Sequence, residues 1–108
     1  MDESGAVNAL GALAQEHRLR LFRLLVRAGR GGMPAGAIAE RLGVPNSSLS
    51  FHLTQLQRAE LIAVERQGRS LVYRADFAAM DRLVAFLMEN CCADESCAAP
   101  TQSQGEQA

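Results

Sequence analysis

Residues 34–60 of this 108-residue chain, PAGAIAERLGVPNSSLSFHLTQLQRAE, read as two short helices joined by a tight turn. Apolar residues of the first helix recur at the spacing of one helical face: Ala35, Ile38, Ala39 and Leu42. Pro34 suits the first turn of a helix, and Gly43 suits the left-handed residue just past its end. Because Pro45 cannot continue a helix, we expect the first helix to stop at Gly43.

The second helix is unusually polar on its outer side. It should begin near Asn46, because good capping residues precede the helically spaced Leu49, Leu53 and Leu56. Its uncharged, hydrogen-bonding side chains are Asn46, Ser47, Ser48, Ser50, Thr54, Gln55 and Gln57. Such side chains near a helix N-terminus can reach base edges, and the terminus itself favours a phosphate. The pattern is typical of a DNA recognition helix, although a serine-rich capped surface helix would also produce it.

The net charge of −1 conceals a strong asymmetry along the chain. Between residues 17 and 74 there are ten arginines and three acidic residues, a net charge of +7, whereas the two ends hold one arginine and nine acids, a net charge of −8. A basic centre with acidic flanks favours a polyanionic partner at one surface. The sequence has neither a membrane-spanning apolar run nor a secretory leader, so we expect a cytoplasmic location.

Three further helical segments surround the central pair. Residues 4–15 are rich in small apolar residues, and residues 16–28 are amphipathic, with His17 interpreted as a capping or solvent-exposed residue. The apolar side of residues 16–28 is expected to contain Leu19, Phe22, Leu25 and Val26. Residues 76–92 carry a wide apolar stripe, with Asp76 as the N-cap. Together with the N-terminal helix, this stripe predicts a dimer surface away from the DNA-facing elements.

A β-hairpin is predicted directly after the recognition helix. Residues 62–65 and 70–73 are rich in strand-forming residues, and Gly68 between them can supply a positive φ. Arg66 and Arg69 flank this glycine, where they can contact a phosphate or enter a minor groove. The position of the hairpin in the order of elements favours a wing over an ordinary solvated turn.

The blocks ALAQEHRLRLFRLL, AIAERLGVPNSSLSFHL and QGRSLVYRA resemble those of the ArsR/SmtB family of winged helix-turn-helix repressors. The resemblance covers about residues 5–90 and implies a mainly α fold with a small β-hairpin, a homodimer, and a repressor of double-stranded operator DNA rather than an enzyme. It places in the major groove Ser47, Ser48, Ser50, Phe51, His52 and, by its polar side chain, Gln55, with Arg66 and Arg69 on the wing. Many members bind metal at a Cys-Val-Cys before the recognition helix, but the matching positions here fall near Pro34 and Gly36.

The sensing chemistry is therefore expected in the segment NCCADESC, which holds Cys91, Cys92 and Cys97. Five residues of chain fold back easily, so one subunit can supply three thiolates. Soft thiolates suit As(III) or Sb(III), which are three-coordinate and thiophilic, as the inducer. Zinc normally needs a fourth ligand, for which Asp94 or Glu95 would have to serve.

The sequence is also compatible with several other functions. The same cysteines suit an organoarsenical-selective site, a thiol redox switch or another metal, and the acidic neighbours argue against unusually reactive thiols. A thiol enzyme would need an activating base, and a winged-helix interaction module would not bind duplex DNA. We interpret residues 1–92 as the DNA-binding and dimerisation domain, and residues 93–108 as a segment that completes the metalloid site with Cys97 and ends in a disordered tail.

Overall fold

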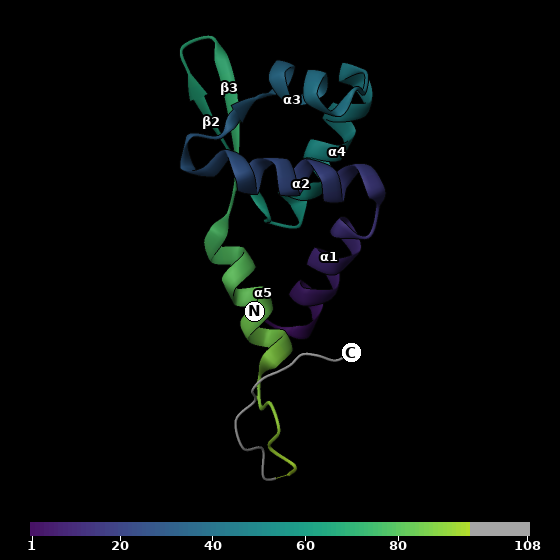
Figure 1. The fold of residues 1–108 in the computed structure, drawn as a ribbon, viewed down its shortest axis with the longest axis vertical. Coiled ribbons are helices and arrows are strands. Elements are labelled where there is room, and N and C mark those ends of the chain that lie inside the picture. The colour runs from purple at the N-terminus through teal and green to yellow at the C-terminus, as the bar shows by residue number, and fades with distance from the viewer. Residues whose placement is uncertain (96–108) are drawn as a thin grey trace.

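The computed structural model of the protein describes residues 1–95, which form helices and a small antiparallel sheet (Figure 1). The α-helices are α1 (Glu3–Leu13), α2 (Glu16–Ala28), α3 (Ala35–Leu42), α4 (Asn46–Arg58) and α5 (Phe77–Met88). The strands are β1 (Met33–Pro34), β2 (Ile62–Gln67) and β3 (Ser70–Ala75), in the sheet order β1-β3-β2. This is the winged helix-turn-helix fold that the sequence predicts.

The predicted end of α3 is confirmed, but the predicted caps were wrong. Pro34 is the N-cap residue of α3 and does not lie in its first turn, and the predicted capping residues of α4 lie inside that helix without a side-chain capping bond. Gly43 is the C-cap residue of α3, with φ +69° and ψ 33°, and its N–H donates to the Ala39 carbonyl. Asn46 begins α4, and Pro45 is its N-cap residue. A short, fixed turn between the two helices therefore sets how α4 is presented.

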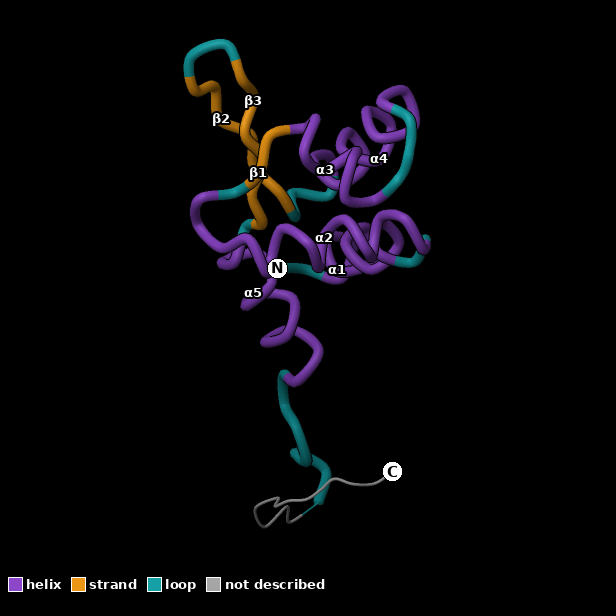
Figure 2. The backbone as a smooth tube through the Cα atoms, turned by 45° about the horizontal axis from the view of Figure 1, so that its top comes forward, coloured by secondary structure: helices purple, strands orange, loops and turns teal. Residues whose placement is uncertain are grey.

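Strand β1 is a feature that the sequence did not reveal. It pairs antiparallel with β3, in the register Met33 with Tyr73 and Pro34 with Val72 (Figure 2). Gly32 comes just before it with φ +67° and ψ −165°, a conformation open essentially to glycine alone. A Cβ at Gly32 would lie 2.4 Å from the carbonyl oxygen of Tyr73, so the approach of the two strands also requires glycine.

The core is built around α2, whose buried residues are Leu21, Phe22 and Leu25. The predicted apolar side of this helix was wrong in part, because Leu19 is 44% exposed and Val26 is 41% exposed. The buried stripe is centred on Leu21 and Leu25, four residues apart on one face, so Leu19 and Val26 fall at its edge. Val26 consequently remains available at the surface of α2.

The elements are divided between two ends of the molecule. The β2–β3 hairpin lies with α3 and α4 at one end, and α1 and α5 extend toward the other, with α2 between them (Figure 1). Several large apolar side chains of α1 and α5 are exposed: Val7, Leu10, Val84, Leu87 and Met88. Their exposure is the pattern expected of an interface helix pair. None of the helices within residues 1–95 is long and apolar enough to cross a membrane.

Helix α5 is shorter than predicted, because it stops at Met88 instead of continuing to residue 92. Asp76 caps its start as expected, with its carboxylate accepting a hydrogen bond from the Ala79 N–H at 3.0 Å. After Met88 the chain enters consecutive turns in which Asn90 has φ +61° and Cys92 has φ +63°. Positive φ cannot continue a right-handed helix, so the cysteines follow α5 in turns.

Candidate nucleic-acid interface

Helix α4 presents a polar face to solvent and is anchored by leucines on its other side. Leu49, Leu53 and Leu56 are buried, which fixes the rotation of the helix. Ser47, Ser48 and Ser50 are exposed, as predicted for residues that face DNA, and Gln55 is half-buried. Phe51 is 57% exposed, which is unusual for a phenylalanine and leaves its ring available to an apolar base edge such as the thymine methyl group.

His52 is not on this outer face, so its predicted position was wrong. Its side chain is only 8% exposed, on the same side of α4 as the leucines. The sequence contained the physical reason, because Leu49, His52, Leu53 and Leu56 have the i, i+3, i+4, i+7 spacing of a single face. The ring of His52 therefore packs on the buried face of α4. A contact with a base would require the ring to lie on the exposed face.

Arg18 connects His52 to the first two helices. Its Nε donates a hydrogen bond to the carbonyl of Ala12 at 2.7 Å, and its Nη1 lies 3.4 Å from Nδ1 of His52. The ring of His17 stacks on that of His52 at a centroid distance of 5.5 Å. Burial, then the positive charge of Arg18, then His17 lower the pKa of His52 below its ordinary value.

The roles of Arg18 and His17 at α4 were missed by the sequence analysis. Gln15, not His17, caps α2, because its side chain accepts from the Arg18 N–H at 3.0 Å. The contact between Arg18 and His52 joins residues 34 positions apart, so no local pattern points to it. The result is a polar link from the end of α1 to the buried side of the recognition helix.

The hairpin has the geometry of a wing with free cations near its tip. Gln67 pairs with Ser70, so Gly68 and Arg69 form a two-residue turn, and the φ of +64° at Gly68 is the one that a glycine supplies. Arg74 is neutralised by Glu65 at 2.6 Å. Arg66 and Arg69 are exposed and form no ion pair with any residue in 1–95, so both charges are available to a phosphate.

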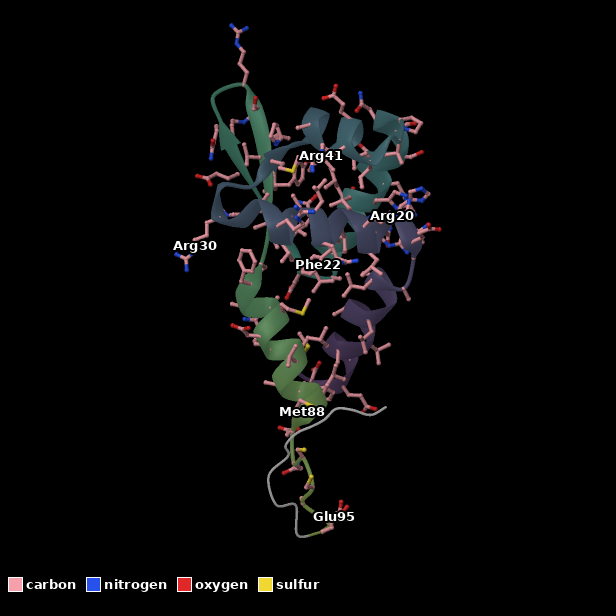
Figure 3. The ribbon with its side chains drawn as sticks, in the orientation of Figure 1. Arg20, Phe22, Arg30, Arg41, Met88 and Glu95 are labelled. Carbon is pink, nitrogen blue, oxygen red and sulfur yellow. The ribbon has the colours of Figure 1, made fainter. Side chains whose placement is uncertain are left out.

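Two of the three candidate metalloid ligands lie side by side after α5. The Sγ atoms of Cys91 and Cys92 are 3.6 Å apart, with Cys91 exposed and Cys92 half-buried. They lie between Met88 and Glu95 in a stretch that projects beyond the helix (Figure 3). No group of three metal-binding side chains occurs within the described 95 residues, and Cys97 and the predicted tail lie outside them.

Comparisons with known proteins agree with this geometry. The family described as a helix-turn-helix domain matches residues 13–65, which contain α2, α3 and α4. The transcriptional repressor SdpR of Bacillus subtilis is 36% identical over 67 residues, which are 61% of this chain and 70% of SdpR.

Among solved structures, an ArsR-like transcriptional regulator from Rhodococcus sp. RHA1 is similar with a TM-score of 0.72 and 28% identity, over 84% of this chain and 82% of that one. The homodimeric winged helix-turn-helix domain Mb0332 from Mycobacterium bovis has a TM-score of 0.64 and 24% identity, over 89% of each chain. The second likeness supports the fold alone.

Proposed function

Because the chain belongs to the ArsR family of winged helix-turn-helix transcriptional regulators, we propose that it is a homodimeric repressor that releases operator DNA when As(III) or Sb(III) binds its cysteines. The family regulates transcription by binding DNA and is not a family of enzymes, as the sequence predicted. We also propose the identity of the inducer, the dimer surface, the individual DNA contacts and a cytoplasmic location.

The main support for DNA binding is the composition of the exposed face of α4. Ser47, Ser48 and Ser50 offer short hydrogen-bonding groups near the helix N-terminus, and Phe51 offers an apolar one, without any competing charge. Arg66 and Arg69 of the wing add two cations, and neither forms an ion pair with a residue that the structure describes. Polar contacts on the helix supply sequence discrimination, and the arginines supply affinity through the phosphates.

Dimerisation is assigned to the exposed apolar residues of α1 and α5. Val84, Leu87 and Met88 are each at least half exposed on α5, and Val7 is 62% exposed on α1. Pairing these faces across a twofold axis buries them and places two copies of α4 at the far side of the molecule. A dimer can then contact two successive turns of the major groove.

The cysteine half of the proposal rests on the closeness of two sulfurs and on their chemistry. The Sγ atoms of Cys91 and Cys92 are 3.6 Å apart, so both sulfurs of the reduced chain lie close enough together to bind the same ion. Cys97 supplies the third thiolate in the proposed site. Three sulfur ligands favour a soft, three-coordinate guest over a hard cation such as Mg²⁺.

The position of the cysteines just after α5 can couple metalloid binding to DNA release. A guest that holds Cys97 against Cys91 and Cys92 constrains the residues that follow the helix, and so changes how α5 packs in the dimer. The spacing of the two recognition helices then no longer matches the operator. A hundredfold loss of DNA affinity requires the metalloid to favour the form that does not bind DNA by about 2.7 kcal/mol. This free energy is within the usual range of allosteric coupling.

The site is tested by equilibrium dialysis of the reduced full chain against arsenite. We expect about one arsenic per subunit for the wild type and a large loss of affinity for Cys91→Ser, Cys92→Ser and Cys97→Ser. Ser96→Ala, which alters the same segment without removing a thiol, is the control and should bind normally. Unchanged binding by all three cysteine variants would refute the site.

Treatment with other thiol-reactive compounds distinguishes the alternative sensor types. Methylarsenite has only two positions for sulfur, so preferential binding of methylarsenite would favour an organoarsenical site. Release of DNA on treatment with diamide, reversed by a reductant, would favour a thiol redox switch. The proposal predicts release by arsenite or antimonite under reducing conditions.

A further inference from the structure

A groove beside α2 combines an apolar floor with a rim of arginines, and its lining includes none of the residues assigned to DNA contact or to the cysteine site. It has a volume of about 640 Å³ and is bounded by α2, the end of α3 and the beginning of α5. This volume falls in the range of small-molecule sites, about 300 to 1,000 Å³. None of the exposed α1 and α5 residues assigned above to dimerisation lines it.

The rim of the groove is strongly cationic. Arg20, Arg23 and Arg27 come from α2 and Arg41 comes from α3; Figure 3 labels Arg20 and Arg41. Arg20 is already paired with Glu16 at 2.6 Å. The other three arginines form no ion pair within the part of the chain that the structure describes. Three guanidinium groups are thus gathered around one groove, and no anion from the described residues neutralises them.

The floor of the groove is apolar. Phe22 and Val26 from α2, Leu42 from α3 and Met80 from α5 contribute to it. Val26 is 41% exposed and Met80 is partly exposed, so apolar surface remains to be covered. Methionine is an adaptable wall for ligands of irregular shape. Such a floor gives no advantage to a hydrophilic polyanion.

We propose that this groove binds an amphipathic carboxylate, an apolar chain or ring whose carboxylate is held by Arg23, Arg27 and Arg41. Guanidinium groups bind carboxylates with two parallel hydrogen bonds, and the apolar body gains by covering the floor. A DNA phosphate can bind the arginines of the rim, but it has no apolar group to cover the floor. Most residues of the groove belong to α2, and this helix lies between the hairpin end and the α1–α5 end of the molecule (Figure 1).

Calorimetric titration of the reduced full chain with decanoate, below its micelle concentration, tests the site. Acetate has the same head without the chain, and decyl maltoside has the same chain without the charge. We expect decanoate to bind at least about tenfold more tightly than either, because both the charge and the apolar contact are required.

Variants locate the binding. Arg23→Gln with Arg27→Gln should weaken decanoate binding about tenfold or more. The matched control, Arg30→Gln with Arg82→Gln, removes the same charge from positions outside the groove and should bind within about twofold of the wild type.

Two results would overturn the assignment. Equal binding of decanoate by both double variants would place the ligand elsewhere, for example on the apolar faces of α1 and α5. A loss of duplex DNA affinity in Arg23→Gln with Arg27→Gln, in a protein that ignores decanoate, would identify this face as a DNA-backbone contact. Both results are independent of arsenite binding, so the cysteine proposal would be unaffected.

Discussion

At the scale of single residues, the buried His52 makes the stability of the protein depend on pH. Its pKa is lowered in the folded state by burial, Arg18 and His17, so the unfolded chain binds a proton more readily. The contribution of His52 is therefore complete above its unfolded pKa of about 6.5 and is lost as the pH falls through that value toward the folded pKa.

Urea unfolding at about pH 7.5 and about pH 5.5 measures this effect. His52→Gln should show a smaller difference between the two unfolding free energies than the wild type. His17→Gln should keep most of the difference, because burial and Arg18, the two larger causes, remain. A wild-type difference that survives in His52→Gln would contradict the assignment.

The two wing arginines are proposed to be separate phosphate contacts. Arg66→Ala and Arg69→Ala should each weaken binding to a duplex that the protein has selected from a random pool. Each substitution removes one cation per subunit and therefore two per homodimer from the DNA backbone, so the slope of log affinity against log salt should become shallower by about 1.8. Arg82→Ala on α5 is the control of equal charge, and the wing assignment fails if its salt slope changes as much as those of the wing variants.

At the scale of elements, Gly32 is the residue on which the junction of β1 with β3 depends. Gly32→Ala should lower the free energy of unfolding by about 2 kcal/mol or more, because it adds backbone strain and a clash with Tyr73. Gly36→Ala meets no atom within 4 Å and lies in α3, so it should be neutral or stabilise by up to about 1 kcal/mol. Equal unfolding free energies for the two variants would show that the close approach does not matter.

The elements also show what the sequence can and cannot predict. Gly43 and Asp76 act through neighbours in the chain, so the end of α3 and the start of α5 were predictable. Strand β1 has only two residues and exists because of its pairing with β3, so no alternating pattern could announce it. The burial of His52 was readable from helical spacing, but its contact with Arg18 depends on how α2 packs under α4.

At the scale of the whole molecule, the dimer should depend on α5 and not on the wing. Leu87→Glu places a charge on a residue that is 55% exposed in the isolated chain, so the fold should survive and the dimer should dissociate. Leu71→Glu, on the 41% exposed Leu71 of the hairpin, is the control and should remain dimeric. Sedimentation velocity distinguishes the two outcomes, and a dimeric Leu87→Glu protein would move the interface elsewhere.

The most direct measurement is the fluorescence anisotropy of a labelled, protein-selected duplex during titration with arsenite under reducing conditions. A dimer that holds DNA through α4 and the wing, and senses metalloid beyond α5, should release the duplex at about one arsenite per subunit. The Cys91→Ser protein should keep it. A wild-type complex that stays intact when arsenite is demonstrably bound would contradict the account.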